Sequence, residues 1–334
     1  MNIIVDAFGG DEGVAEVVKG CVEASNDFDV TVTLVGDEQI LSQALSGYEN
    51  TQNIRIVHAD EVIDNSDDPV TAIRRKKNAS MVVGLHMLKD GEGDGFVSAG
   101  NTGALLAGAT LIVGRLKGID RPALAPFLPK NDGLFMLLDA GANTNCKPLN
   151  LAQFAILANA YVRRVVGVES PKVYLLNNGA EEGKGDALRK ETFPLLQKLP
   201  LHFCGNVEAR ELPYADADIV VADGFTGNVV LKLYEGLGLY FGRQIKGMFM
   251  KNLFSKLAAL TMKGSIREFK DKMDYTEYGG APLLGVKKPV FKTHGSSKSK
   301  EFYYTIEKVK RFAENNVLDE VVDCIAQIGV MDHE

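Results

Sequence analysis

The sequence predicts an α/β fold of three layers, in which helices cover both faces of a largely parallel sheet. Short apolar runs typical of buried strands recur along the chain, and longer segments with helical spacing separate them. Strands and helices that alternate in this way form parallel sheets, whose ligand sites lie in loops beyond the carboxyl ends of the strands. The expected strands are residues 3–5, 30–35, 54–57, 95–97, 134–138, 172–176, 201–204 and 219–221.

Three longer segments are expected to be helices, at residues 69–88, 149–166 and 184–197. Pro69 suits the first turn of a helix, where its missing N–H is not needed. No internal repeat or low-complexity linker divides the chain. We therefore expect a single domain over residues 1–334, with two subdomains as the alternative.

The composition excludes several classes of protein. A net charge of -7 argues against a nucleic-acid-binding groove, which needs clustered Lys and Arg without opposing acids. The four cysteines form no CxxC pair, so neither a zinc site nor a disulfide framework is expected, and a reducing cytoplasm fits best. The start, MNIIVD, is typical of a strand and not of a signal peptide, and no apolar run is long enough to span a membrane.

Five polar clusters rich in glycine follow expected strands. Glycine lets the backbone approach a ligand closely, and a helix that begins there offers free N–H groups to phosphate or to an oxyanion. Each cluster alone could simply turn the chain and cap the next helix. Five of them on one sheet edge favour a site for an anionic substrate. The clusters are DAFGGD at 6–11, SAGNTG at 98–103, DAGAN at 139–143, NNGAEEGK at 177–184 and DGFTGN at 223–228.

The chain shows no sign of a covalent nucleophile. It has no GxSxG motif, and no cysteine has an adjacent histidine. Among the five histidines, only His294, in KTHGSS at 292–297, is placed for chemistry. Lys184, between two glycines, either reaches a phosphate or faces solvent, and the local sequence leaves both open.

These clusters, in this order, resemble the phosphate acyltransferase (PlsX) family over nearly the whole chain. The resemblance implies a fold like that of the isocitrate and isopropylmalate dehydrogenases and the phosphotransacetylases. It also implies a homodimer that converts long-chain acyl groups on acyl carrier protein, with inorganic phosphate, into acyl phosphate for phospholipid synthesis. The matching stretches are DAFGGD at 6–11, VSAGNTGALLAGA at 97–109, LDAGAN at 138–143, GNVEAR at 205–210, DGFTGNVVLK at 223–232, and YGGAPLLG with THGSS at 278–297.

For such a reaction phosphate is already a nucleophile, so the enzyme must position it and stabilise the oxyanion, and neither a metal nor a cofactor is expected. The catalytic candidates are Lys184, His294 and Asn228. Asp139 and Asp223 are expected to orient donors and cap turns, because an ionised carboxylate repels phosphate. The full set of candidates for binding substrate or phosphate is Asp6, Gly9, Gly10, Gly100, Asn101, Thr102, Gly103, Asp139, Asn143, Asp223, Gly224, Thr226 and Ser296.

Three rival functions stay open at this point. A short-chain phosphotransacetylase that uses coenzyme A needs the same phosphate site with a different thiol carrier. A dehydrogenase is disfavoured, because no nucleotide-binding fingerprint is present. A non-catalytic scaffold that recruits carrier protein and lipid enzymes to the membrane does not need five polar clusters.

The C-terminal third is predicted to carry an added, protruding helical element over residues 236–275. Residues 236–267 contain no acid, and on a helix one apolar face is formed by Phe249, Leu253, Phe254, Leu257 and Leu260, with lysines opposite. That face either packs on protein or binds a membrane. We expect reversible attachment to anionic lipid on the inner face of the cell membrane. Contact with a downstream glycerol-3-phosphate acyltransferase is a further expectation. The apolar segment 229–241 is expected either at a dimer interface or inside one subunit.

Overall fold

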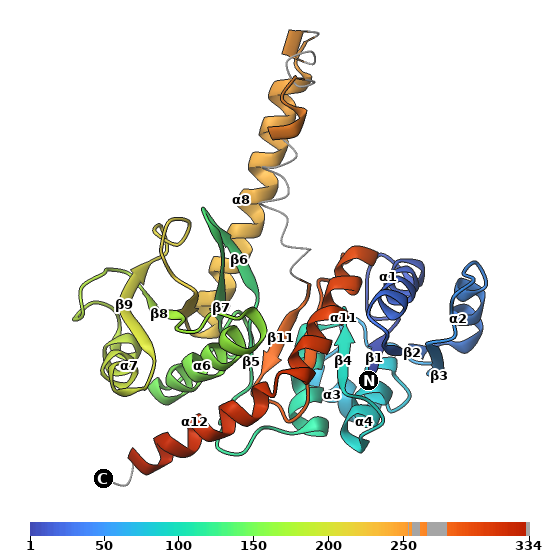
Figure 1. The fold of residues 1–334 in the computed structure, drawn as a ribbon, viewed down its shortest axis with the longest axis horizontal. Helices are drawn as coiled ribbons and strands as arrows, with labels where there is room; N and C mark the ends of the chain where they lie inside the picture. The colour runs from blue at the N-terminus through green and yellow to red at the C-terminus, as the bar shows by residue number, and fades with distance from the viewer. Residues whose placement is uncertain (253, 256–260, 266–278, 332–334) are drawn as a thin grey trace.

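The computed structural model describes residues 1–252, 254–255, 261–265 and 279–331. Two sheets organise these residues, each with its own helices, and they lie side by side (Figure 1). All eight expected strands are confirmed. Four strands were not predicted, namely β5 (Ala123–Leu124), β6 (Phe127–Lys130), β11 (Ala281–Leu284) and β12 (Val290–Lys292).

The first sheet has seven strands in the order β3-β2-β1-β4-β12-β11-β5. Its strands other than β5, β11 and β12 are β1 (Asn2–Asp6), β2 (Thr31–Gly36), β3 (Ile54–His58) and β4 (Gly95–Ser98). The strands from β3 to β12 run parallel, whereas β11 runs antiparallel to both of its neighbours. The register pairs Ser98 with both Asp6 and Lys292. Three polar side chains therefore end three adjacent strands at one edge.

The second sheet has five strands in the order β6-β7-β10-β8-β9, all parallel except β6. Its remaining strands are β7 (Gly133–Leu138), β8 (Lys172–Asn177), β9 (His202–Glu208) and β10 (Ile219–Val221). The polar clusters at 139–143, 177–184 and 223–228 follow β7, β8 and β10, as the alternation of strands and helices predicted.

Helices cover both faces of the first sheet, because the side chains of its strands alternate between two cores. Ile3 and Val5 of β1 are fully buried in one core, whereas Ile4 is buried in the other. On the side of Ile3, α1 (Val14–Asp27) packs against α11 (Ser299–Glu314), and on the side of Ile4 lie α4 (Ser80–Asp90) and α5 (Thr102–Gly108). Burying each such side chain contributes about 1.5–3 kcal/mol.

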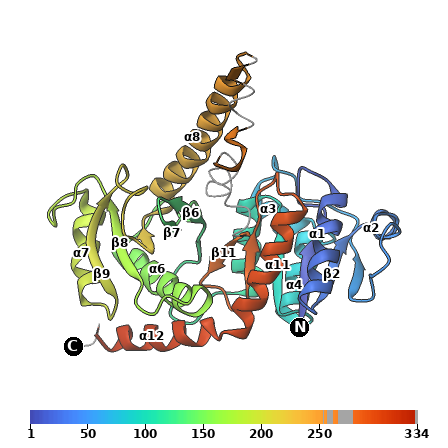
Figure 2. The same cartoon turned by 45° about the horizontal axis from the view of Figure 1, so that its top comes forward.

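The second sheet packs on α6 (Pro148–Tyr161), which in turn packs on α7 (Ala187–Lys198) and α12 (Val317–Met331). The core on the α6 side is continuous with the core beneath α1 and α11, so apolar packing joins the two sheets. In Figure 2, α12 runs from the first sheet along the underside of the second. The remaining short elements are α2 (Glu38–Leu45), α3 (Pro69–Arg75), η1 (Ala109–Val113) and η2 (Val162–Val166).

The single helix expected at 69–88 was wrong, because the chain breaks it into α3 and α4. Lys76 leaves the helical conformation, with φ of −84° and ψ of 74°. Its ammonium donates to the Val62 carbonyl at 2.9 Å and to Asp67 at 2.6 Å. These contacts with the preceding loop fix the break. Pro69 does occupy the first turn, as expected.

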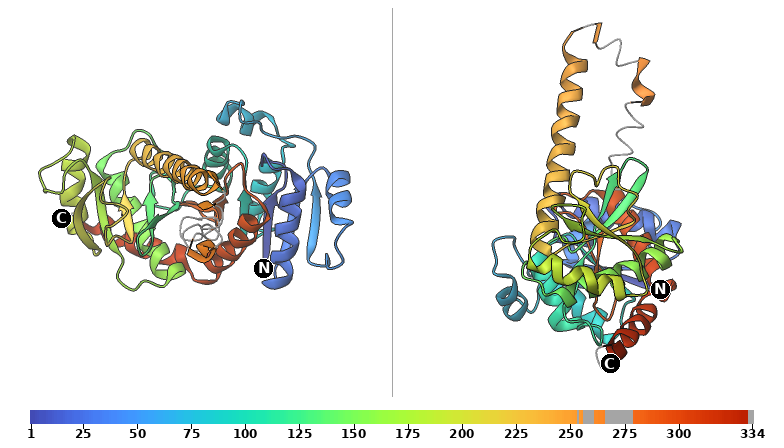
Figure 3. Two further views of the ribbon diagram at one scale, coloured as in Figure 1. Left: turned by 90° about the horizontal axis from the view of Figure 1, so that it is seen from above. Right: turned by 90° about the vertical axis from the view of Figure 1, so that its left-hand side faces the viewer.

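The protruding element is the helix α8 (Gly224–Met250), which is 27 residues long and projects far beyond both sheets (Figure 3). It begins 12 residues before the expected start at 236 because Asp223 caps it at the end of the second sheet. Of the predicted lipid-binding face, Phe249 and Phe254 are described, whereas Leu253, Leu257 and Leu260 lie outside the described residues. Among the described helices, none combines the length and the apolar character needed to cross a membrane.

Candidate active site

A cavity of about 370 Å³ lies between the two sheets, at the base of α8. Part of its lining is apolar and comes from both lobes, each lobe being one sheet with its helices, through α5, the β5–β6 segment, α8 and β11. This part includes Leu105, Leu124, Phe127, Leu128, Leu231 and Leu283. The polar groups that line the cavity are Thr102, Asn228, Lys232, Glu235, Lys292, Thr293, His294 and Glu301. The cavity therefore combines apolar side chains with a smaller number of polar ones, the usual composition of a small-molecule site.

Lys292 ends β12 and provides a partly buried cation that lines the cavity. Its ammonium donates to the carbonyl of Ala99 at 2.9 Å and also to the carbonyl of Thr293. Burial lowers the pKa of Lys292 to about 8, although Glu301, Asp6 and Asp11 act in the opposite direction. The sequence did not identify this lysine, because β12 was not predicted as a strand.

His294 lines the cavity two residues after Lys292. Its Nδ1 accepts the backbone N–H of Ser296 at 3.2 Å and lies 2.8 Å from the Ser296 hydroxyl. Because Nδ1 acts as an acceptor, the neutral ring carries its proton on Nε2, which can donate to a ligand. Ser296, a predicted binding residue, thus orients His294 and does not itself line the cavity.

Asn228 projects from the second turn of α8 into the cavity, and its carboxamide has no hydrogen bond with any described residue. Close packing of the α8 start on the β7–α6 loop sets its position. A Cβ on Gly227 would lie 1.9 Å from the Asp139 carbonyl oxygen, and one on Gly224 would lie 2.6 Å from the Asn143 carbonyl oxygen. Only glycine permits this approach at either position.

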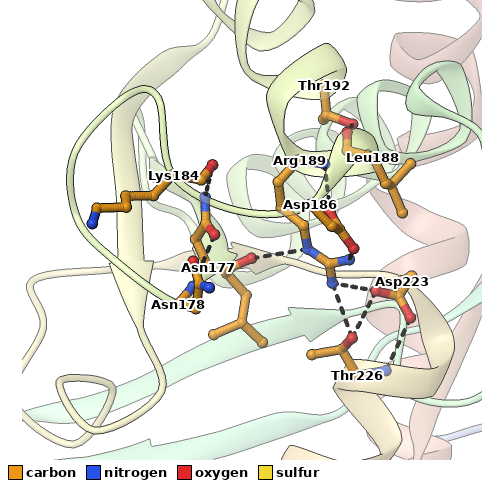
Figure 4. Close-up of polar contacts among 10 residues, drawn as sticks. Asn177, Asn178, Lys184, Asp186, Leu188, Arg189, Thr192, Asp223 and Thr226 are labelled. Atoms are coloured by element: carbon orange, nitrogen blue, oxygen red, sulfur yellow. Dashed lines mark hydrogen bonds and ion pairs between the residues drawn. The ribbon is translucent and has the colours of Figure 1, made fainter.

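A buried ionic network fixes the first turn of α8 (Figure 4). Arg189 of α7 donates to Asp223, to the Thr226 hydroxyl at 2.9 Å and to Asp186 at 2.9 Å. Asp223 also caps the helix by accepting the Thr226 N–H at 3.0 Å. Burial raises the pKa of Asp223, but the Thr226 hydrogen bonds and the Arg189 cation outweigh it, so the pKa lies below its ordinary value.

The backbone N–H groups at the start of α8 are largely occupied. Gly224 donates to the Asn143 carbonyl at 2.8 Å, Thr226 to the Asp223 carboxylate and Gly227 to the Asp223 carbonyl at 2.9 Å. This turn therefore stabilises the helix start instead of presenting those three donors to a phosphate. Asn228, one residue further on, is the part of the cluster that reaches the cavity.

Asp139 holds the β7–α6 loop from inside. Its carboxylate accepts the N–H groups of Leu124 at 3.0 Å, Ala142 at 3.1 Å and Asn143 at 2.6 Å, together with the Asn143 side-chain amide at 2.9 Å. Burial raises the pKa of Asp139, and these hydrogen bonds oppose the shift. Neither Asp139 nor Asn143 lines the cavity, although the next residues of the same loop, including Gly141, do.

Asp6 plays the corresponding part in the first sheet. It accepts the hydroxyls of Ser80 at 2.6 Å and Ser98 at 2.7 Å, and burial raises its pKa against these hydrogen bonds. Gly9 packs so closely that a Cβ there would lie 2.6 Å from the Gly100 nitrogen. Gly10 lies against Ala99, where a Cβ would be 3.3 Å from the Ala99 side chain. The Asp6 cluster therefore shapes the loops that reach the cavity.

Of the predicted binding residues in the 98–103 cluster, Thr102 and Gly103 line the cavity. Asn101 caps α5 by accepting the Ala104 N–H at 2.9 Å, and Gly100 donates to the Ser98 hydroxyl at 3.0 Å. Among all the predicted site residues, four therefore lie together around the cavity, namely Thr102, Gly103, Asn228 and His294.

Lys184 lies on the exposed loop after β8 and does not line the cavity. Its backbone carbonyl accepts the Asn177 amide at 3.1 Å, while its ammonium extends away from Arg189 and Asp223 (Figure 4). No acid within the described part of the chain forms an ion pair with it. A role for Lys184 at the cavity requires this loop to move toward it.

Known proteins resemble this chain over nearly its whole length. A family model described as "Fatty acid synthesis protein" matches residues 1–320. A phosphate acyltransferase from Thermoanaerobacter pseudethanolicus is 48% identical over 330 residues, covering 98% of each chain. A phosphate acyltransferase from Oceanobacillus iheyensis is 46% identical over 335 residues, covering 100% of each chain.

Solved structures with low sequence identity confirm the predicted fold. A phosphotransacetylase from Streptococcus pyogenes superposes with a TM-score of 0.62 at 18% identity, covering 93% of this chain and 94% of that chain. A 4-hydroxythreonine-4-phosphate dehydrogenase from Klebsiella pneumoniae gives a TM-score of 0.52 at 14% identity, covering 94% and 99%. The family model and the relatives span nearly the whole sequence, and the chain therefore belongs to the phosphate acyltransferase family.

Proposed function

We propose that the protein uses this cavity to transfer a long-chain acyl group from acyl carrier protein to inorganic phosphate. A phosphate oxygen attacks the thioester carbonyl carbon and forms a tetrahedral oxyanion. The C–S bond then breaks, the proton of hydrogen phosphate passes to the departing thiolate, and acyl phosphate and free carrier thiol are the products. The observation that carries the proposal is the cavity itself, because its apolar residues suit an acyl chain and its lysine, histidine and asparagine side chains offer donors to phosphate and to the oxyanion.

The lining residues favour direct attack by phosphate. Neither cysteine nor serine, the usual nucleophiles of acyl-enzyme intermediates, is among the described residues that line the cavity. The Asn228 amide and the His294 Nε2–H can both donate to the oxyanion. Donors fixed in advance stabilise such a charge most effectively within a site shielded from water.

We keep Lys184 as a third catalytic candidate, in a closed form of the site. It follows β8, at the same sheet edge as the loops after β7 and β10. Its exposed ammonium forms no ion pair with a described acid, so it is available to a second anion such as the phosphate or the carrier prosthetic group.

The donor preference tests the proposal against its rivals. The protein is incubated with palmitoyl acyl carrier protein or with acetyl coenzyme A, each with and without phosphate, and free thiol is measured. We expect phosphate-dependent thiol release from both or from the carrier protein alone, with a higher kcat/KM for palmitoyl acyl carrier protein than for acetyl coenzyme A. A preference for acetyl coenzyme A would identify a short-chain phosphotransacetylase. If neither donor gave turnover, a non-catalytic scaffold would be the remaining candidate.

A homodimer through α8 is also part of the proposal. One face of the helix exposes an apolar stripe, in which Val229, Leu233, Leu237 and Tyr240 are 53%, 57%, 44% and 54% exposed. A contiguous stripe of this kind is typical of an interface. Sedimentation should give a dimer for the parent and a monomer for Leu233→Glu, while Tyr214→Glu, on the second lobe, should remain a dimer. A monomeric parent at micromolar concentration contradicts this part.

The far end of α8 is proposed to attach reversibly to the cytoplasmic face of the membrane. Met248, Met250 and Phe254 are 67%, 57% and 84% exposed, and Lys246 and Lys251 add exposed positive charge. Apolar and basic side chains together suit a bilayer with anionic lipids. Such attachment would deliver acyl phosphate near a glycerol-3-phosphate acyltransferase, the downstream partner that we propose.

A further inference from the structure

The ammonium of Lys292, which lines the cavity, has one N–H donor that is not used in a hydrogen bond with a described residue. A lysine carries three N–H donors. Two of them are taken by the carbonyls of Ala99 and Thr293, and no other hydrogen bond links this ammonium to a described residue. Because the lysine lines the cavity, the third donor is available to a ligand there.

Thr293 supplies a second donor with no partner. Its side chain is 1% exposed and lines the cavity, yet its hydroxyl forms no hydrogen bond with the part of the chain that the structure describes. A buried hydroxyl without a partner is unusual, because it has lost its hydrogen bonds to water and gained none in return. Two unsatisfied donors on consecutive residues indicate a built site for an oxygen-rich anion.

The acids around Lys292 do not occupy its free donor. Asp6 accepts the hydroxyls of Ser80 and Ser98, and Glu301 accepts the backbone N–H of His294 at 3.3 Å. Burial lowers the pKa of Lys292, and the fields of Glu301, Asp6 and Asp11 oppose this shift without a hydrogen bond to the ammonium.

Lys292 is also held in place before any ligand arrives. Its two carbonyl partners fix the ammonium, whereas Lys232, the other lysine of the cavity, extends from the exposed side of α8. A fixed donor loses less conformational entropy on binding than a mobile one. Ala99 directly precedes the loop that brings Thr102 and Gly103 to the cavity, so an anion bound at Lys292 lies beside the start of α5.

We infer that Lys292 and Thr293 form the binding site of the attacking phosphate, with the free ammonium N–H and the threonine hydroxyl donating to phosphate oxygens. This inference rests on the proposed function and assigns its nucleophile to the part of the cavity that β12 lines. Asn228 on α8, which belongs to the other lobe, then faces the thioester carbonyl.

Steady-state kinetics of three variants test the assignment. Lys292→Met and Thr293→Val should each raise the KM for phosphate about 10- to 100-fold, as expected for the loss of a hydrogen bond to a charged group, and leave the KM for the acyl donor unchanged. Lys288→Met, on the β11–β12 connection outside the cavity, should behave like the parent. Thr293→Val removes an unpartnered hydroxyl without changing the shape, so it should melt no lower than the parent.

A second measurement uses the unaltered protein. Amine acetylation by a soluble N-hydroxysuccinimide ester is followed residue by residue with mass spectrometry, and phosphate should protect Lys292 but not Lys288. Equal labelling of Lys292 with and without phosphate, or an unchanged phosphate KM in Lys292→Met, overturns the inference even where the parent releases thiol normally. A parent that releases no thiol overturns the proposed function instead, and the protection experiment still decides whether phosphate binds here.

Discussion

Arg189 of α7 donates to the carboxylate of Asp223, the residue that caps α8, so a buried ion pair joins the helix that protrudes from the protein to the second lobe. The same guanidinium bonds the Thr226 hydroxyl at 2.9 Å. Both side chains of the pair are nearly inaccessible, at 10% and 5% exposed. The pair therefore fixes the turn from which Asn228 enters the cavity.

Replacing Arg189 by Met should destabilise the protein by about 3–5 kcal/mol, because it leaves the Asp223 carboxylate buried without its cation. Since the pKa of Asp223 is lowered in the folded protein, its stabilising contribution is present above about pH 4 and is lost as the pH falls through the folded-state value. Arg210→Met is the matched control, because the exposed Arg210 pairs with surface acids and should cost less than about 1 kcal/mol. Urea unfolding at pH 7 measures both, and equal small losses would contradict a structural role for the Arg189 pair.

Asn228→Ala and His294→Ala should each lower kcat about 100- to 1,000-fold, because each removes a donor to the oxyanion. Neither side chain is part of the buried core, so the melting temperatures should stay near that of the parent. Asn131→Ala, on the exposed β6–β7 turn, is the control and should keep full turnover. If both cavity variants retain normal kcat, backbone groups stabilise the oxyanion and the assignment fails.

The same assay decides the role of Lys184. Lys184→Ala should lower turnover more than Lys190→Ala, an exposed lysine of α7, if the loop after β8 closes over the cavity during the reaction. Equal turnover in the two variants would show that Lys184 is a surface residue.

The KM for phosphate should depend on pH through Lys292. Burial lowers the pKa of this lysine to about 8, against the opposing fields of Glu301, Asp6 and Asp11. The cation is present below about pH 7 and is lost as the pH rises through about 8, so the KM should then rise by up to about tenfold per pH unit. Lys292→Arg stays charged and should give a flat profile up to about pH 10. A parallel rise in this variant would assign the titration to another group.

Phe254→Glu should release the protein from vesicles that contain anionic lipid, because Phe254 is 84% exposed beyond the end of α8. Turnover with soluble substrates should stay near that of the parent. Co-sedimentation is compared with that of Tyr214→Glu, which changes an exposed aromatic residue on the second lobe and should bind vesicles normally. Unchanged binding of Phe254→Glu, or a parent that never binds, would reject membrane attachment through this helix end.

The fold was largely predictable because its parallel strands are short, apolar and regularly spaced. The four strands that were missed have two to four residues, and two of them contain proline, so their local patterns are weak. Their place in the sheets depends on partners distant in sequence, as when β12 pairs with β4. The break at Lys76 likewise depends on tertiary contacts with Val62 and Asp67 that no helical periodicity reveals.

The site could be predicted where its residues belong to a polar cluster that is visible in the sequence. Asn228 and His294 belong to clusters visible in the sequence, and both line the cavity. Lys292 and Thr293 lie in the segment 292–297, which the sequence analysis noted for His294. Their own assignment as binding residues depends on burial and on the unpartnered Thr293 hydroxyl. Neither property can be derived before β12 is placed beside β4.

Product balance is the sharpest test of acyl transfer from carrier protein to phosphate. The protein is mixed with palmitoyl acyl carrier protein and isotopically labelled phosphate, and free thiol and acyl phosphate are measured together over time. We expect one acyl phosphate to form for each thiol released, and neither product in the absence of phosphate. Thiol release that continues without phosphate, or that leaves free fatty acid in place of acyl phosphate, would contradict acyl transfer to phosphate.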